Sequence, residues 1–478
     1  MLPEVFIRFH TADQALQAVF DAAEEKCRRN LRLFGPYQVL VEGGGYEKIW
    51  LETQPMGGEM YALRSLEAAK NNAALFMRCQ RPDGRLPGSI RWAEGRLIPE
   101  FNKLQGFCFP DHALNLYYLL GRDEAFLRET EDALRLFDRY LHAARDVNGD
   151  GTLSSFCVYD TGEDGAARYG DAPCWWEEEA PPEGFQVVPM ASMDVTSWSY
   201  ACRSALAEIC RIRGDEEKAA GWQAKAKKTA QALTDRLWDE ARGAFFDRDK
   251  NGDRVDVLGH HTLRCMYFGS ASAQQAGRFV REHLLSPNEF WTALPLPSVS
   301  VSDPAFCNAP ENNWSGQPQG LTFQRTIVAL ENYGYHKIVT ALGEKLIGAV
   351  QAGGCRFTQQ FDPFSGRPSL VHAVTHQPVS PGGSEPVQDA YGPTLLSVLT
   401  FIAHRYGIHP RLGKVWWSLG GGKPCEWEAA FYGHRYTLKS DGRRAELAVD
   451  GKALRAHPCG VRLITDERGE LLSKVDIE

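Results

Sequence analysis

The sequence lacks the features that mark membrane-spanning, exported and nucleic-acid-binding proteins. No run of about 18 apolar residues occurs, so no membrane-spanning helix is expected. The opening stretch, MLPEVFIRFHTADQ, has no basic segment followed by an apolar one, so no signal peptide is expected. The net charge is −8, and no block of Lys and Arg exists to bind phosphates. These absences predict a cytoplasmic protein that binds neither nucleic acid nor a membrane.

The cysteines are not arranged in closely spaced pairs. Twelve of them are scattered along the chain with no Cys-x-x-Cys pair, and we expect them to be reduced core residues. Two acidic turns, 146–151 and 247–252, begin with the spacing of a calcium-binding loop. The twelfth position of these loops is Cys157 in one and Leu258 in the other, where calcium binding needs a bidentate Glu. We therefore expect no metal and no cofactor.

What the sequence has in abundance is helical periodicity. Apolar residues recur at three- and four-residue spacing over segments at 12–32, 57–80, 111–121, 123–145, 194–214, 215–238, 255–269, 271–285, 319–334, 336–352 and 391–407. Turns within several helix pairs are short, whereas loops between pairs are long and rich in Gly, Pro and aromatic residues. This alternation predicts an all-α dominated (α/α)6 toroid over residues 1–412, with the long loops at one mouth. An α-solenoid would need a repeat of fixed length, and none is visible.

The pattern changes after residue 412. The stretch 426–454 alternates apolar and polar residues, with turn signals at 440–442 and 450–451. The alternation continues to the last residue. We therefore expect residues 413–478 to form a small β-rich appendage that packs on the helical barrel.

One loop crowds negative charge into a segment that cannot be a regular helix. In 159-YDTGEDGAARY-169, Asp160, Glu163 and Asp164 lie among two glycines. A solvated surface turn would explain this composition. A pocket that holds a catalytic acid would explain it as well, because like charges raise the pKa of one member and keep it protonated. Aromatic residues make up 11% of the chain, and many lie in loops, where they would suit either sugar stacking or core packing.

Ten loop segments together resemble a known family. They are, in order, 50-WLETQPMGGEMYA-62, 80-QRPDGRLPG-88, 106-GFCFPDHALNLYYLLGR-122, 146-DVNGDG-151, 160-DTGEDGAAR-168, 194-DVTSWSY-200, 237-LWDEARGAFFDRD-249, 293-ALPLPSVSVSDP-304, 313-NWSGQ-317 and 357-FTQQFDPFSG-366. The set resembles the clan of inverting α-glycosidases that contains glycoside hydrolase family 63, the bacterial mannosylglycerate hydrolases and the trehalases. The resemblance covers roughly residues 45–407. It implies hydrolysis, with inversion, of a small α-linked glucoside, mannoside or glycosyl-glycerate-like saccharide.

The resemblance assigns the general acid to Asp164. The family acid lies in a Glu-Ser-Gly-Trp-Asp-Asn-Ser-Pro-Arg segment, and 160-DTGEDGAAR-168 matches its acidic, Gly, Asp and Arg positions. A glycosidic oxygen leaves poorly until it is protonated, so a neutral carboxyl group must lie beside it. Asp164 would supply that proton, with Asp160 and Glu163 as charged neighbours.

The position of the general base departs from the family. The family Glu lies two residues before the aromatic residue of an aromatic-Asp-Pro-x-Ser/Thr-Gly motif, and here that position is Gln359. A neutral amide cannot take a proton from water. Three interpretations stay open. Another carboxylate acts as the base, with Glu385 first and Asp389 second; phosphate replaces water, as in an inverting phosphorylase; or the protein binds sugar without turnover.

The resemblance also implies a set of sugar-pocket residues. They are Trp50, Gln54, Glu59, Phe109, Arg168, Trp175, Trp314, Gln317, Gln359 and His376, with Phe109 as a stacking wall. Glu59 could instead pair with Arg64 on the same helix, and the run 175-WWEEE-179 could be a lid or an interface patch. The expected partner is a small saccharide, and the oligomeric state stays open. A helical-repeat scaffold, the remaining alternative, would have no deep pocket among its loops.

Overall fold

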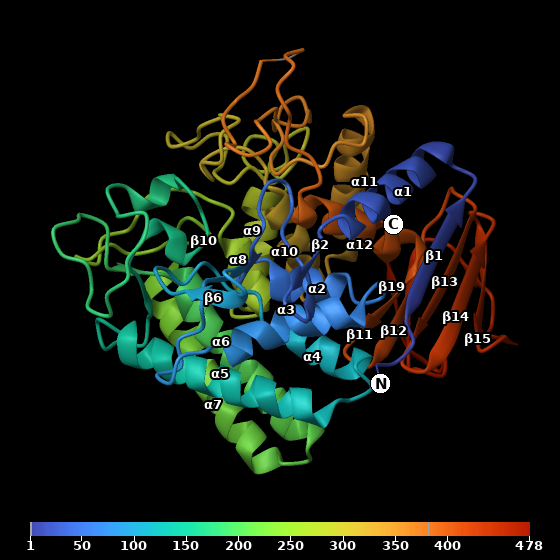
Figure 1. Cartoon of the computed structure of the whole chain (residues 1–478), viewed down its shortest axis with the longest axis horizontal. Coiled ribbons are helices and arrows are strands. Elements are labelled where there is room, and N and C mark those ends of the chain that lie inside the picture. Colours follow the sequence, from blue (N-terminus) through green and yellow to red (C-terminus); the bar gives the residue numbers. More distant parts are fainter. Residues whose placement is uncertain (1, 381) are drawn as a thin grey trace.

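Twelve α-helices run through the part of the chain that the computed structural model describes, residues 2–380 and 382–478 (Figure 1). They are α1 (Gln14–Arg28), α2 (Gln54–Met60), α3 (Leu66–Arg78), α4 (Pro110–Leu119), α5 (Glu124–Ala144), α6 (Met193–Ile212), α7 (Glu216–Leu237), α8 (Thr262–Phe268), α9 (Ala273–Phe279), α10 (Gly320–Glu331), α11 (His336–Ala352) and α12 (Gly392–Tyr406). The expected dominance of α-helices is confirmed.

The even-numbered helices form a closed series of contacts. They touch in the order α2, α4, α6, α8, α10 and α12, and α12 touches α2. The odd-numbered helices pack against this series, with α3 on α2, α5 on α4, α7 on α6, α9 on α8, α11 on α10 and α1 on α12. Each outer helix therefore covers an inner one, and the loops at one end can meet over the middle of the series.

The helix predicted over 57–80 is two helices in the structure. α2 ends at Met60, and α3 begins after Ser65, whose hydroxyl oxygen accepts a hydrogen bond from the Ala68 amide at 3.1 Å. A serine in this position starts a new helix, which a pattern of apolar residues does not reveal. The helix predicted over 255–269 is also shorter, because only α8 is helical there.

Strands from both ends of the chain build the β region. One sheet has the order β1 (Phe6–Thr11), β13 (Cys425–Phe431), β14 (His434–Ser440), β15 (Arg444–Val449) and β16 (Lys452–Ala453), with β17 (His457–Pro458) on β15. The other has β11 (Ile408–Arg411), β12 (Lys414–Leu419), β18 (Val461–Thr465) and β19 (Leu471–Asp476). In Figure 1 the dark blue β1 lies beside the red strands. The expected boundary at residue 412 therefore differs from the structure, which groups β1 and β11 with the C-terminal strands.

Shorter strands lie in the loops between helices. They are β2 (Leu31–Phe34) with β3 (Tyr37–Leu40), β4 (Ile49–Trp50) with β5 (Ser89–Ala93) and then β6 (Arg96–Glu100), β7 (Ser154–Ser155) with β8 (Met190–Ala191), and β9 (Trp238–Asp239) with β10 (Ala244–Phe245). The pairing of β7 with β8 closes the base of the long acidic loop between them. The ends of that loop are therefore fixed, although most of it has no regular structure.

Aromatic contacts fix the β region on the helices. The ring of Phe9 on β1 lies 5.0 Å from that of Phe20 on α1 and 5.2 Å from that of Trp427 on β13. Between the two sheets, the ring of Trp417 meets that of Tyr436 at 5.7 Å. All five side chains are buried, and each large apolar side chain contributes about 1.5–3 kcal/mol when fully buried.

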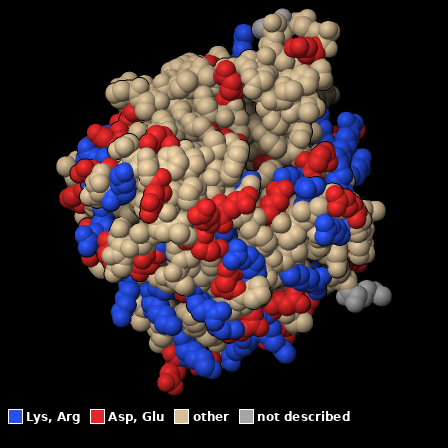
Figure 2. Space-filling view, turned by 60° about the vertical axis from the view of Figure 1, so that its left-hand side comes forward, with Lys and Arg blue, Asp and Glu red and all other residues tan. Residues whose placement is uncertain are grey.

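The surface carries charge of both signs. On the face shown in Figure 2, Lys and Arg are interspersed with Asp and Glu, and no continuous basic area is visible. None of the described helices combines the length and the apolar character needed to cross a membrane. The loops before α10 and before α12 (yellow to orange) gather at the top of Figure 1.

Candidate active site

The loops enclose a cavity of about 150 Å³ that contains the predicted acid, Asp164. It is lined by Glu42, Tyr46, Trp50, Glu52, Lys103, Gln105, Tyr159, Gly162, Asp164, Asn312, Trp314, Gln359 and Tyr391. These residues come from β4, from the loops on either side of it, from the loops before α4 and β8, and from those before α10 and α12. A cavity of this volume accommodates one six-membered ring.

Asp164 is half-buried on the loop between β7 and β8, and its Oδ2 atom accepts a hydrogen bond from the Asn312 side-chain amide at 2.8 Å. Burial raises the pKa of Asp164 to about 6. Lys103 and the Asn312 hydrogen bond oppose this rise, and the charge of Glu163 adds to it. A carboxyl group with this pKa is half protonated near pH 6, so Asp164 meets the first requirement of a general acid.

Two further carboxyl groups, Glu42 and Glu52, line the same cavity and are buried. Burial raises the pKa of Glu42 well above its usual range; the charges of Glu52 and Asp164 raise it further, and the hydrogen bond from Tyr391 lowers it. Burial also raises the pKa of Glu52 to about 7, against the opposing charge of Arg325. Because like charges disfavour ionisation, the three groups share fewer than three negative charges near neutral pH.

Two tryptophans form walls of the cavity. The Lys48 and Lys103 ammonium groups lie 5.1 and 5.4 Å from the Trp50 ring. The indole nitrogen of Trp50 is buried without a hydrogen-bond partner among the described residues, so it can donate to a ligand hydroxyl. Trp314 is buried and has a φ of 39°, a left-handed conformation that is uncommon for a bulky residue and concentrates at functional sites.

Gln359 occupies the position to which the family resemblance assigns the general base. Its Oε1 atom accepts a hydrogen bond from the Tyr46 hydroxyl at 3.0 Å. Its backbone amide donates to Gln388 at 2.9 Å, and its carbonyl accepts from the Gly320 amide at 2.8 Å. The side chain is therefore held at the cavity wall, but an amide there cannot accept a proton from water.

Glu163, next to Asp164 in the chain, belongs to a buried ion-pair cluster, which we define as Glu163, Arg168, Asp194, Asp247 and Arg264. The Arg168 guanidinium lies 2.5 Å from Glu163 and 2.6 Å from Asp194, and it also pairs with Asp247. Arg264 lies 2.8 Å from Glu163. Although burial alone would raise it, Arg168 and Arg264 hold the pKa of Glu163 well below its usual range. The cluster thus anchors the acidic loop to α6 and α8.

Three side chains in this region lie close enough together to bind a metal ion. The ligand atoms of Glu163, His260 and His261 lie within 4.8 Å of one another. However, Glu163 already pairs with the guanidinium groups of Arg168 and Arg264, and a cation would be repelled by both at close range. The arrangement therefore fits an ion-pair cluster better than a metal centre.

The structure brings part of the predicted site together. The lining residues include Asp164, Trp50, Trp314 and Gln359. Two more predicted residues contact the lining. The exposed ring of Trp175 lies 6.3 Å from that of Tyr159, and the ring of His376 stacks on that of Tyr46 at 4.3 Å.

Several predicted pocket residues lie elsewhere in the interior. They are Gln54, Phe109, Gln317 and, in the ion-pair cluster, Arg168. Gln54 accepts a hydrogen bond from the Trp50 amide at 2.8 Å, and Gln317 donates to Asn308 at 3.0 Å. Phe109 is fully buried at the start of α4 and forms no stacking wall. A match to a family position indicates the neighbourhood of a residue but not the direction of its side chain.

The expected base Glu385 does not lie at the cavity. Its side chain is exposed on the loop before α12, and the structure does not bring it together with Asp164. Asp389, the second candidate, pairs with Lys26 at 2.5 Å and also lies outside the lining. A solvated carboxylate outside the cavity cannot activate a water molecule within it.

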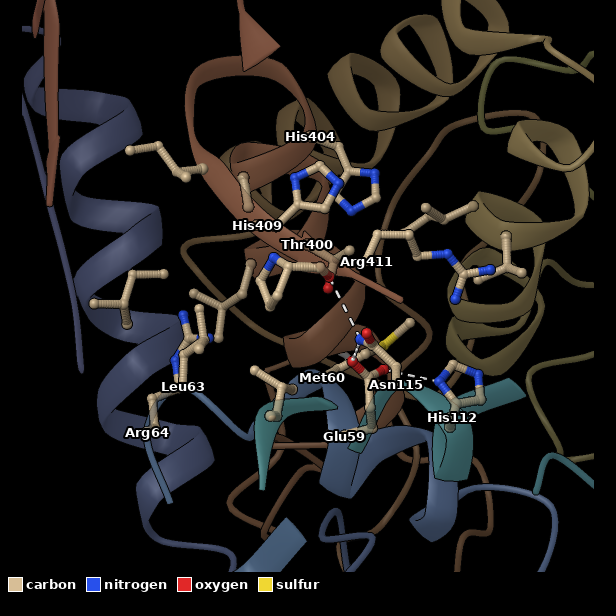
Figure 3. Close-up of a pocket in the computed structure, with 18 of the residues that line it drawn as sticks. Glu59, Met60, Leu63, Arg64, His112, Asn115, Thr400, His404, His409 and Arg411 are labelled. Carbon is tan, nitrogen blue, oxygen red and sulfur yellow. Dashed lines mark hydrogen bonds and ion pairs between the residues drawn. The ribbon is translucent and has the colours of Figure 1, made fainter. Parts of the chain in front are cut away.

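Glu59 faces a second cavity, of about 90 Å³, between the helices and the strands β1 and β11 (Figure 3). Its carboxylate lies 2.8 Å from the His112 ring and accepts a hydrogen bond from Asn115. The alternative pairing with Arg64 does not form either, because Arg64 bonds to Glu24 at 2.8 Å. Glu59 is therefore remote from the lining of the Asp164 cavity.

Much of the lining is not evident from the sequence. Glu42, Tyr46, Lys103, Asn312 and Tyr391 were not among the expected pocket residues, yet all reach the cavity. One signal was available in 42-EGGGY-46, where an acid opens a glycine-rich turn just before a predicted pocket tryptophan. The others lie in loops whose contacts depend on the folded chain.

Both the sequence and the fold match known proteins. The family model of the mannosylglycerate hydrolase MGH1-like glycoside hydrolase domain matches residues 59–377. A curated mannosylglycerate hydrolase of Rubrobacter radiotolerans is 30% identical over 183 residues, which cover 37% of this chain and 40% of that relative. A family 63 mannosylglycerate hydrolase of Thermus thermophilus, solved in complex with glucose, aligns with a TM-score of 0.61 and 17% identity over 81% of this chain and all of its own. A solved sialidase aligns with a TM-score of 0.70 and 14% identity over 97% of this chain and 41% of its own.

The structural likenesses, at these low identities, show the fold, which is that of the family 63 type of glycosidase. The family model covers about two thirds of the chain. The chain therefore belongs to the mannosylglycerate hydrolase MGH1-like family of glycoside hydrolases, and the resemblance found in the sequence is confirmed. The chain spans less than half the length of the curated relative that it matches.

Proposed function

We propose that this protein hydrolyses a small α-linked glycoside with inversion, and that Asp164 is the general acid. The observation that carries the proposal is the cavity itself, in which a carboxyl group with a pKa of about 6 faces a space for one sugar ring. Trp50 and Trp314 supply apolar walls. The closed series of inner helices supports an (α/α)6 barrel with this cavity at its loop end.

The proposed substrate is an α-glucoside, an α-mannoside or a glycosyl-glycerate-like compound with a short leaving group. The name of the relatives, mannosylglycerate hydrolase, supports a short acidic leaving group. So does Lys103, the one cationic residue among the described residues of the lining. Its ammonium group is close enough to Asp164 to influence the pKa of that acid, and it could pair with a carboxylate next to the bond that breaks.

The proposed chemistry is a single displacement. Asp164 donates its proton to the glycosidic oxygen while water attacks the anomeric carbon from the opposite face. The base that accepts the proton of this water should lie roughly 6.5–9.5 Å from the acid, so that both the sugar and the water fit between them. Neither Gln359 nor the exposed Glu385 can fill this role.

A substrate panel tests the proposal. The protein is incubated with α-disaccharides and with mannosyl- and glucosylglycerate, each with and without inorganic phosphate, and the released sugars are measured. Release that does not need phosphate is expected. Release of a sugar phosphate only when phosphate is present would identify a phosphorylase, to which the amide at Gln359 is also suited. Binding heat without any product would identify a sugar-binding protein, and either result would overturn the proposal.

A further inference from the structure

The cavity wall that carries Gln359 also carries a carboxyl group, that of Glu42. The backbone joins the two positions. The Tyr391 amide donates to the Phe357 carbonyl at 2.9 Å, and the next amide, that of Gly392, donates to the Glu42 carbonyl at 2.6 Å. Residue 42 is therefore separated from the segment that holds Gln359 by a single stretch of chain, the one that carries Tyr391.

Side-chain contacts also link Glu42 to Gln359, through Tyr391 and Tyr46. The Tyr391 hydroxyl donates to Glu42 Oε1 at 2.9 Å. The rings of Tyr391 and Tyr46 meet edge to face at 6.2 Å, and the Tyr46 hydroxyl donates to Gln359 at 3.0 Å. Tyr391 is the one side chain, among the described residues, that bonds to the Glu42 carboxyl group. The second oxygen of Glu42 is thus free to bond to a water molecule in the cavity.

We propose that Glu42 is the general base of this glycoside hydrolase and replaces the carboxylate that is absent at Gln359. The inference rests on the proposed function and names the missing partner of Asp164. Glu42 lies outside residues 59–377, where the family model matches, so the family position does not assign this role.

The other buried carboxyl group of the cavity, Glu52, is less suited to the role. Its Oε1 atom accepts a hydrogen bond from Gln105 at 2.9 Å, and its Oε2 atom lies 3.4 Å from the Arg325 guanidinium. It also presses against the acidic loop, since a Cβ atom on Gly162 would lie 1.9 Å from Oε2. Glu52 therefore packs against the loop that carries Asp164, whereas a base must face the acid across the sugar.

The proposed step balances with water alone as co-reactant. An oxygen of ionised Glu42 takes a proton from water while the water oxygen bonds to the anomeric carbon. The glycosidic C–O bond breaks, its electron pair stays on the leaving oxygen, and that oxygen takes the proton of Asp164. Glu42 ends protonated and Asp164 ionised, and exchange with solvent restores both. Protonation of Asp164 before the step removes one like charge from the cavity, which favours ionisation of Glu42.

Glu42→Gln tests the assignment against a matched control on the same loop. The variant should lose about 10²–10⁴-fold in kcat, the range for loss of a general base. Glu47→Gln removes an exposed carboxylate that pairs with Arg32 at 2.7 Å, and its kcat should equal that of the wild type. Glu385→Gln should also keep the wild-type kcat, because its side chain is exposed outside the cavity.

Two rescue experiments separate catalysis from a merely structural role. The double variant Glu42→Gln/Gln359→Glu restores a carboxylate at the family position and should recover at least about tenfold of the lost kcat. Sodium azide is a charged nucleophile that needs no base, so it should accelerate Glu42→Gln and yield a glycosyl azide of inverted configuration. Azide should leave Asp164→Asn slow. Absence of both rescues would overturn the assignment.

The outcomes distinguish this inference from the proposed function. If the wild type hydrolyses a glycoside and Glu42→Gln keeps its kcat, the base assignment is wrong and the proposed function stands. If the wild type releases no sugar from any glycoside by hydrolysis, both the base assignment and the proposed function are wrong. If Glu42→Gln does not fold, Glu42→Asp, which keeps the charge but withdraws it by one methylene, should still lose kcat with little change in KM; a wild-type kcat there would overturn the assignment.

Discussion

Asp164 and Glu163 are consecutive residues, yet they lie in regions with opposite electrostatics. Among the described residues that line the cavity, three carboxyl groups accompany the ammonium group of Lys103, and burial raises the pKa of Asp164 to about 6. In the ion-pair cluster, two guanidinium groups outweigh the effect of burial and hold the pKa of Glu163 well below its usual range. The comparison shows that the surroundings of each carboxyl group, and not the number of acids in the loop, decide its protonation.

The acidic loop has a different part in each region: the ion-pair cluster fixes its backbone, and the cavity contains Asp164. The cluster joins the loop to Asp194 on α6 and Arg264 on α8, so it fixes the backbone one residue away from the acid. Asp160 adds a second anchor through Arg145 at 2.7 Å. Asp164 alone of these acids reaches the cavity. A loop that looks like a solvated turn in the sequence is therefore held by buried ion pairs next to Asp164, the proposed proton donor.

The largest effect on activity is expected from Asp164→Asn. It should lower kcat/KM by about 10²–10⁴-fold for a substrate with a poor leaving group, because an amide cannot donate the proton. It should not lower the free energy of unfolding, since a neutral amide is buried more easily than a carboxylate. Initial rates and urea unfolding measure the two properties. A substrate with a good leaving group, such as a glycosyl fluoride, should lose much less activity, and an equal loss for both substrates would contradict the acid role.

Glu163→Gln, unlike Asp164→Asn, should lower the free energy of unfolding. Removal of this carboxylate leaves Arg168 and Arg264 with fewer buried anions, and breaking a buried ion pair in this way costs about 3–5 kcal/mol of unfolding free energy. Chemical denaturation of Glu163→Gln and Asp164→Asn in parallel compares their free energies of unfolding directly. A loss of less than about 1 kcal/mol, as for an exposed ion pair, would show that the cluster does not anchor the loop.

The pH dependence should give a smaller and graded effect. Asp164 must be protonated and Glu42 ionised to act, so kcat/KM should fall at high pH, where Asp164 loses its proton, and at low pH, where Glu42 gains one. Asp164 binds its proton more tightly in the folded state than in the unfolded chain, where its pKa is near 3.8. Its contribution to stability is therefore greatest at low pH and is lost as the pH rises from about 4 to about 6. Asp164→Asn should remove this part of the pH slope of stability, and an unchanged slope would argue against the raised pKa.

Much of the helical part could be predicted because each helix buries one face. On α5, for example, Phe126, Leu134 and Leu141 are buried at helical spacing, and that pattern is visible in the sequence. The strand that pairs with β1 could not be predicted from the sequence. Phe6–Thr11 pairs with a strand near the other end of the chain, and six alternating residues do not specify such a partner.

The site was predictable where a motif has fixed spacing and unpredictable where packing decides. Asp164 follows from the family spacing of its loop, and the departure at Gln359 is visible in the same way. Glu42 is different, because its place in the cavity depends on contacts with Tyr391, far along the chain. Phe109 shows the converse, since it lies in a family segment yet points into the core.

The anomeric configuration of the first product shows whether the glycosidic bond is hydrolysed with inversion. Proton NMR can follow hydrolysis of an α-glycoside by the wild type before the released sugar mutarotates. The β-anomer should appear first, because water attacks the face opposite the bond that Asp164 helps to break. Appearance of the α-anomer first, or of no free sugar, would contradict hydrolysis with inversion.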